Sequence, residues 1–121
     1  MRCVDTSDPK APTHVGKLIE TAVVSKGSSC SAMLDEARKL LFIAGGLGMV
    51  VLDVSDPTNA VELQTGIDPG VYSKDGGGFV ALGPSGKHVF ACGGLGLSVY
   101  ETVMSNKALE KIRKRRRKLT E

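Results

Sequence analysis

The sequence contains no tryptophan, and Tyr and Phe together make up only 4% of its 121 residues. It also has no apolar run that approaches the roughly 20 residues of a membrane-spanning helix, so we expect no membrane span. The opening residues, Met1-Arg2-Cys3-Val4-Asp5, lack the apolar segment of a secretory signal. These absences predict an intracellular protein, cytoplasmic or nuclear, with few large side chains for its core.

Residues suited to chemistry are equally sparse. The three cysteines, Cys3, Cys30 and Cys92, form no zinc-type spacing, and because Cys packs as a small hydrophobe we expect buried free thiols. His14 and His88 are isolated, and no Ser/His/Asp or Cys/His set can be argued from their spacing. We therefore predict no catalytic residues, no metal site, no cofactor and no enzyme activity.

What the sequence does contain is an internal repeat with a period of 48 residues. Val4-Asp5-Thr6-Ser7-Asp8-Pro9 returns as Leu52-Asp53-Val54-Ser55-Asp56-Pro57, and Phe42–Gly48 returns as Phe90–Gly96 without a gap. Short β-type runs recurring with a period in the 40s are typical of β-propeller blades. A closed propeller needs at least about four blades, and this chain has about two.

The repeat divides into four short strands. In the intact unit we expect strands over 31–34, 39–44, 49–54 and 60–64, separated by turns. The second unit repeats the first three over 79–82, 88–92 and 97–100, and the start of the chain supplies a strand end at Val4-Asp5 and a fourth strand over 13–19. We predict an all-β fold of antiparallel four-stranded propeller blades in an incomplete ring, over 1–102, with one complete blade near 23–65.

The turn residues recur with the repeat. Aspartates that end a strand or precede proline commonly accept backbone N–H groups in Asx turns, and glycine pairs allow the positive φ of tight hairpins. A strand follows each glycine pair, which disfavours a phosphate-binding loop. We assign structural turn roles to Asp5, Asp8, Pro9, Asp53, Asp56, Pro57, Gly45, Gly46, Gly48, Gly93, Gly94 and Gly96.

Two of these motifs resemble the LVIVD-type propeller repeat. Leu52-Asp53-Val54-Ser55-Asp56-Pro57 is similar to its apolar run followed by Asp, a small residue and a Ser-Asp-Pro turn. Ala44-Gly45-Gly46-Leu47-Gly48 is similar to the hairpin that precedes that run. The resemblance covers about residues 3–101 and implies binding or surface modules, with no catalytic residues to carry over.

The last part of the chain differs from the repeats. Residues 103–121 hold eight of the sixteen Lys and Arg and two of the thirteen Asp and Glu, which gives +6 against −3 for the rest. Ser105 or Asn106 can cap a helix, and Leu109, Ile112 and Leu119 form a thin apolar stripe. A basic helix and a disordered tail fit equally well. The basic run resembles a nuclear localisation signal and a polyanion-binding patch, and its cations are Lys111, Arg113, Lys114, Arg115, Arg116, Arg117 and Lys118.

Two functions follow from these observations. The first is a non-enzymatic interaction module built from propeller repeats, which binds a protein partner or self-associates through open blade faces. The second is a nuclear or nucleic-acid-associated protein that contacts phosphates non-specifically through the basic tail. The low number of blades also fits a truncated copy of a longer propeller, and this alternative stays open.

Overall fold

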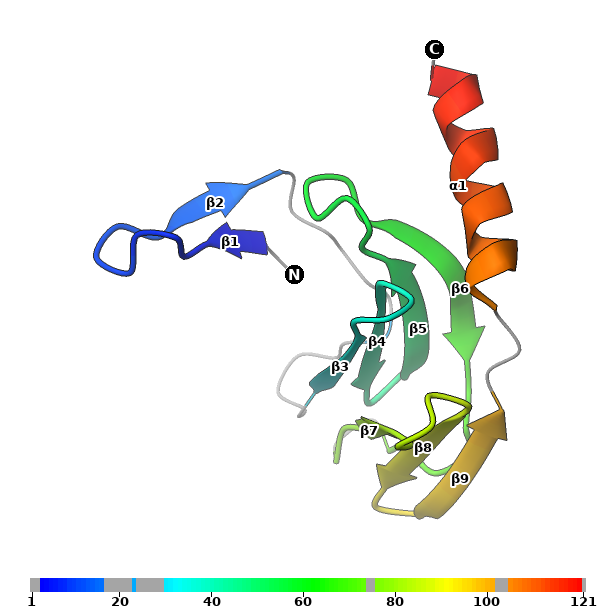
Figure 1. Ribbon diagram of the computed structural model, residues 1–121. Coiled ribbons are helices and arrows are strands. Elements are labelled where there is room, and N and C mark those ends of the chain that lie inside the picture. The colour runs from blue at the N-terminus through cyan, green and yellow to red at the C-terminus, as the bar shows by residue number, and fades with distance from the viewer. Residues whose placement is uncertain (1–2, 17–22, 24–29, 74–75, 102–104, 121) are drawn as a thin grey trace.

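The computed structural model describes residues 3–16, 23, 30–73, 76–101 and 105–120, which form three antiparallel sheets and one helix (Figure 1). The elements are β1 (Cys3–Asp5), β2 (Thr13–Val15), β3 (Ser31–Asp35), β4 (Leu40–Gly45), β5 (Gly48–Asp53), β6 (Val61–Ile67), β7 (Phe79–Leu82), β8 (His88–Gly93), β9 (Gly96–Glu101) and α1 (Asn106–Thr120). The all-β class is confirmed, and the C-terminal segment is the helix rather than the disordered tail.

Each sheet follows chain order. β3-β4-β5-β6 form a four-stranded sheet, β7-β8-β9 a three-stranded sheet, and β1-β2 a hairpin that projects from the rest of the chain (Figure 1). The two hairpins β4–β5 and β8–β9 close at the same repeat position, where Gly48 and Gly96 both have a φ of +138°. Since side chains rarely adopt this conformation, both turns require glycine there. The expected positive φ falls on these residues and not on the glycine pairs Gly45-Gly46 and Gly93-Gly94.

The projecting hairpin is a shorter copy of the β5–β6 ribbon. Asp53 pairs with Val61 in the ribbon, and Asp5 pairs with Thr13 in the hairpin, so the register is the same 48 residues apart. The fourth strand expected over 13–19 is observed as β2 but ends at Val15, since Gly16 leaves the strand with a φ of +70°; residues 17–19 lie outside the described residues. Within the described part of the chain, β9 is followed by α1 and not by a fourth strand.

The main core lies between the two larger sheets. β7 lies against β3 and β4. One face of the four-stranded sheet packs on the inner face of β7–β9, and the buried side chains of this cluster are Leu40, Phe42, Ala44, Met49, Val71, Tyr72, Val89, Ala91 and Leu109. A second cluster, on the opposite face of the four-stranded sheet, contains Val23, Ile43, Val50 and Leu52. β4 and β5 are therefore buried on both faces, which explains their nearly continuous apolar sequence.

α1 is anchored at its N-terminal half. The Ser105 hydroxyl oxygen accepts the Ala108 N–H at 3.1 Å, which is a helix N-cap. Leu109 is fully buried in the main core, whereas Leu119 is 85% exposed. The expected apolar stripe therefore ends before Leu119, because the upper part of the helix extends past the sheet (Figure 1).

The expectation of buried thiols was wrong. Cys30 and Cys92 are exposed, and Cys3 is half-buried. Cys92 alternates with the buried Val89–Ala91 side of β8 and so lies on the outer face of that strand. The error arose because its repeat equivalent, Ala44, is fully buried by the second sheet.

Truncating Leu109 to Ala should destabilise the fold by about 2–4 kcal/mol, because a buried Leu leaves a cavity. The matched substitution Leu119→Ala in the same helix should change stability by less than about 0.5 kcal/mol. Urea unfolding followed by circular dichroism measures both changes. Equal effects of the two substitutions would show that α1 does not dock through Leu109.

Candidate functional site

The recurring aspartates lie at the end of a strand (Asp5 and Asp53) or in the turn that follows it (Asp8 and Asp56), and each accepts the N–H of the residue two positions on. Each of these oxygen–nitrogen distances is 2.9 or 3.0 Å, and the pairs are Asp5–Ser7, Asp8–Lys10, Asp53–Ser55 and Asp56–Thr58. Pro9 and Pro57 occupy the same turns and are exposed. The repeat therefore preserves the same hydrogen bonds from backbone N–H groups to aspartate side chains.

Asp53 differs from the other three, because it also binds the basic helix. Its side chain is 1% exposed. Arg113 Nε donates to Oδ2 at 3.1 Å and Arg113 Nη2 donates to Oδ1 at 3.2 Å, which is a two-point guanidinium–carboxylate contact. Arg116 Nη2 donates to the same Oδ2. Two cations of the predicted polyanion-binding run thus neutralise a buried carboxylate of the first unit.

A second arginine–aspartate pair adjoins this contact in the β3–β4 turn. Arg38 Nε donates to Asp35 Oδ2 at 2.5 Å, and both residues are buried. The Arg38 carbonyl accepts Arg113 Nη2 at 2.6 Å, and Arg38 Nη2 donates to the Gly86 carbonyl at 2.5 Å in the β7–β8 turn. The five charged residues, which we call the Asp53 cluster, are Asp35, Arg38, Asp53, Arg113 and Arg116.

The cluster fixes the ionisation of Asp53. Burial alone would raise the pKa of this carboxyl, but hydrogen bonds from Arg113, the Ser55 N–H and Arg116 outweigh burial. The pKa of Asp53 is therefore well below its ordinary value. A carboxylate held in this way stabilises the fold and is a poor proton acceptor at neutral pH.

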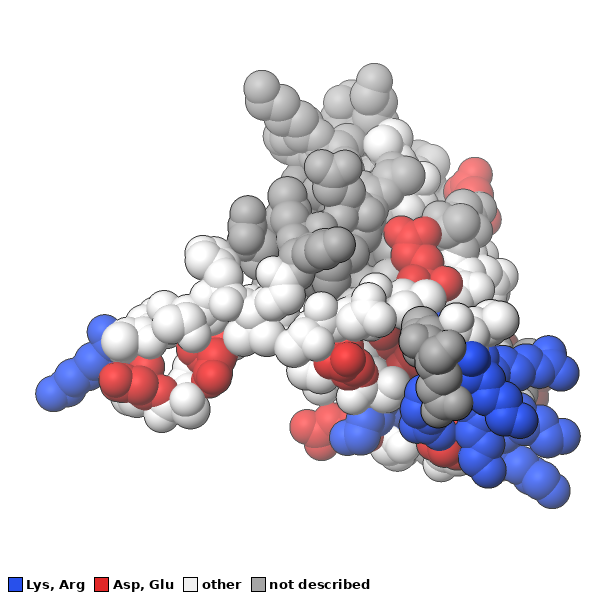
Figure 2. All heavy atoms as spheres, turned by 90° about the horizontal axis from the view of Figure 1, so that it is seen from above, with Lys and Arg blue, Asp and Glu red and all other residues white. Residues whose placement is uncertain are grey.

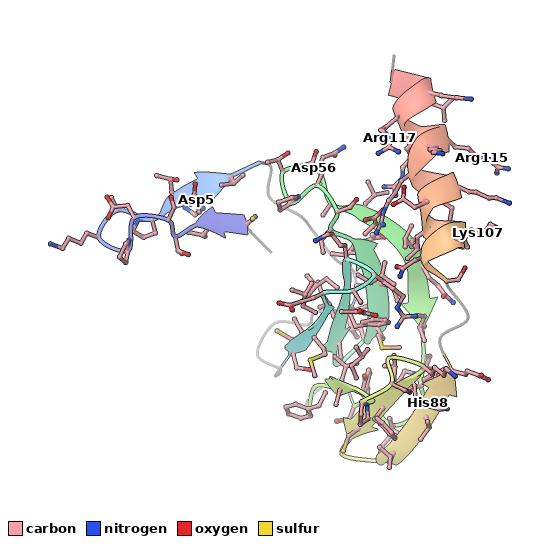
Figure 3. All side chains as sticks on the ribbon, in the orientation of Figure 1. Asp5, Asp56, His88, Lys107, Arg115 and Arg117 are labelled. Carbon is pink, nitrogen blue, oxygen red and sulfur yellow. The ribbon has the colours of Figure 1, made fainter. Side chains whose placement is uncertain are left out.

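The docked helix divides its cations between two sides. Arg113 and Arg116 face Asp53, and Arg117 points toward the body of the protein, opposite to Lys107 and Arg115 (Figure 3). The outer stripe of α1 has helical spacing and all its members are exposed; it consists of Lys107, Lys111, Lys114, Arg115 and Lys118. Seen from above, Lys and Arg side chains gather around α1 and project away from the sheets (Figure 2).

Two hollows border these elements. An apolar hollow of about 330 Å³ opens between the four-stranded sheet and β8–β9, and its lining includes Val51, Leu63 and Tyr100. A polar hollow of about 450 Å³ lies beside the Asp53 cluster and includes Lys39, Asn59 and Arg117. Its lining carries both signs of charge, since Asp56 and Glu110 also border it.

Most of the outer face of β7–β9 is apolar and uncovered within the described structure, and the polar pair His88 and Glu101 borders it at one end. Phe79, Cys92 and Leu97 lie side by side across the three strands, and Ala81, Phe90 and Val99 form the neighbouring row. Phe79, Phe90, Leu97 and Val99 are 49%, 36%, 62% and 54% exposed. These six residues, which we call the outer face, form a contiguous apolar patch.

Sequence reasoning found the turn aspartates and the basic run but missed the links between them. Asp53 and Arg113 are 60 residues apart, so no local pattern joins them. The outer face was also missed, although alternation along β8 could have indicated it. His14 and His88 are exposed and neither belongs to the Asp53 cluster, although His88 lies two residues after Gly86, whose carbonyl accepts a hydrogen bond from Arg38.

Comparisons with known proteins do not assign the chain to a family. Known protein families, curated proteins and solved structures were compared with the chain, and none matches it. A search of the described residues finds no helix with the length and apolar character needed to cross a bilayer. Over the same residues, no group of three or more His, Cys, Asp or Glu side chains is arranged to hold a metal ion.

Asp53→Ala should destabilise the protein by roughly 3 kcal/mol or more, because it leaves Arg113 and Arg116 without their buried counter-charge. Asp5→Ala is the matched control, because Asp5 lies at the equivalent position but is exposed and contacts neither arginine, so its loss should destabilise the protein much less. Chemical denaturation compares them. Similar losses in the two variants would contradict the contribution of the arginines.

Tyr72 makes stability sensitive to alkaline pH. Burial, followed by the neighbouring Tyr100 and Cys92, raises the pKa of Tyr72 from 10.0 to about 12, and its hydroxyl donates to the Phe79 carbonyl at 3.0 Å. The folded state therefore retains this proton at a pH where the unfolded state loses it, so stability present below pH 10 falls as pH rises toward 12.

The wild type should lose about 2 kcal/mol more stability than Tyr72→Phe between pH 10 and pH 12. Denaturation curves at both pH values, measured on the two proteins, test this difference. Parallel losses in the wild type and the Phe variant would show that other groups account for the alkaline effect.

Proposed function

We propose that the chain is a non-enzymatic protein-interaction module built from propeller-type blades, and that the outer face of β7–β9 is its binding surface. One observation carries this proposal. The outer face is the repeat equivalent of the face of β3–β5 that is covered inside the chain. Phe90, Leu97 and Val99 correspond to Phe42, Met49 and Val51, respectively.

The intramolecular packing indicates what such a face does. In the first unit, Phe42 and Met49 are 4% and 3% exposed because the inner face of β7–β9 covers them. In the second unit, the equivalent side chains keep a third to two thirds of their surface in solvent. Covering apolar area contributes roughly 25 cal/mol per Å², so the outer face favours association with another polypeptide surface.

A photo-crosslinking residue in place of Phe90 should form discrete adducts in cells, because the side chain lies in the middle of the proposed surface. The same residue in place of Leu95, which is 69% exposed in the neighbouring hairpin turn, is the control. Mass spectrometry identifies the adducts. Val99→Lys should abolish them, since it places a charge in the patch. The proposal fails if position 90 yields no adduct, or no more than position 95.

A second candidate function rests on the outer stripe of α1. Its five cations point away from the Asp53 cluster, so they are placed to contact a phosphate backbone without disturbing the fold. α1 contains no aromatic residue beside these cations, which disfavours base stacking. Under this proposal the chain binds nucleic acid without sequence preference and is nuclear or nucleic-acid-associated.

Removing three stripe cations, as in Lys111→Ala/Lys114→Ala/Arg115→Ala, should lower the slope of log affinity against log salt by about 3 on duplex DNA, because each phosphate contact contributes about 0.9. The control Lys10→Ala/Lys87→Ala removes exposed lysines elsewhere and should leave the slope unchanged. Fluorescence anisotropy between about 50 and 200 mM salt measures the slopes. Equal slopes in the wild type and the triple variant would eliminate the stripe as a phosphate-binding surface.

A further inference from the structure

We infer that the occupant of the outer face is a second copy of this chain, packed outer face to outer face about a twofold axis. This inference rests on the proposed function, because it requires the outer face to be a binding surface. It goes further by naming the partner, the symmetry and the residues at the centre of the contact.

The outer face continues a packing that is already present within the chain. The outer face is the repeat equivalent of a face that binds an antiparallel sheet of this same chain. Along the central strand β8, Phe90 and Cys92 correspond to Phe42 and Ala44, which are buried in the covered face. The covered face of the first unit thus binds a sheet of this same chain, and the outer face presents the equivalent positions to solvent.

Burial within a single chain determines which sheet face of the second copy is available. A head-to-tail arrangement would use the opposite face of the four-stranded sheet, where Ile43, Val50 and Leu52 lie. These side chains are 5%, 1% and 0% exposed within a single chain, so that face is already occupied. The outer face of the second copy is exposed, and pairing two identical patches gives a closed dimer rather than an open series.

The size of the patch sets the strength of the contact. Three strands about 4.8 Å apart and about 20 Å long cover roughly 200–300 Å² of sheet per copy. Two copies thus bury less than the roughly 1,200 Å² at the low end of stable complexes. The dimer should form reversibly in the micromolar range or above, and its population should depend on protein concentration.

Sedimentation equilibrium of the full chain, from low micromolar to near-millimolar concentration, tests the inference. The mass of the wild type should rise from one chain toward two and then stop. Val99→Lys should weaken dimerisation at least tenfold, because it buries an unpaired ammonium group. Leu95→Lys, the matched control in the adjoining turn, should leave it unchanged, and equal melting curves of both variants show that folding is intact.

Cys92 provides an independent readout of orientation, since it lies on β8, the central strand of the outer face. In a Cys3→Ser/Cys30→Ser background, a bis-maleimide spanning the roughly 10 Å between face-packed sheets should link two chains through Cys92. The control variant Cys3→Ser/Cys92→Ser retains only Cys30, which is also exposed, and should give little crosslinked dimer at equal concentration.

Several results would overturn the inference. A monomer at all concentrations, a dimer that Val99→Lys does not weaken, a mass that continues past two chains, or equal crosslinking through Cys30 and Cys92 would each do so. The crosslinking experiment at position 90 distinguishes these results from a failure of the proposed function. If the residue at position 90 captures a different protein while the pure chain stays monomeric, only the second-copy inference fails; if it captures nothing, both fail.

Discussion

The buried carboxylate of Asp53 connects the C-terminal helix to the repeats. It ends β5, accepts the N–H that forms the following turn, and receives two guanidinium groups from α1. Such a contact is costly to desolvate and becomes favourable only when its charges and hydrogen bonds are fully matched. Arg113 meets this requirement at both carboxylate oxygens, and the position of Leu109 one turn earlier keeps the helix in register with the core.

The same turn position has different consequences in the three copies of the motif. Asp5 is exposed and serves its turn alone, whereas Asp53 serves its turn and the helix. The Ser7 N–H lowers the pKa of Asp5 by a backbone hydrogen bond, while that of Asp53 depends also on the two arginines. In the second unit the position is Glu101. Within the described structure, the repeated residue thus makes tertiary contacts only in the copy where another element, here α1, packs against it.

Local features were predictable from the sequence because their causes are local. Strand alternation, glycine at Gly48 and Gly96, and the turn aspartates depend on neighbours within a few residues. The Asp53 cluster was not predictable, because it brings together residues 35–38, 53 and 113–116. The exposure of Cys92 was mispredicted for a related reason: burial in a stacked sheet depends on what lies beyond it, and the repeat pattern alone does not specify this.

The contact between Arg38 and the Gly86 carbonyl joins the two units through a side chain on one and the backbone on the other. Arg38 and Gly86 are equivalent positions in the repeat, so the donor in the first unit has no counterpart in the second. Because every residue carries a carbonyl, this hydrogen bond does not require any particular side chain at position 86. The turn geometry does constrain that position, since Gly86 has a φ of +73°. At this position, therefore, the second unit can change its sequence without losing the junction, as long as the turn geometry is kept.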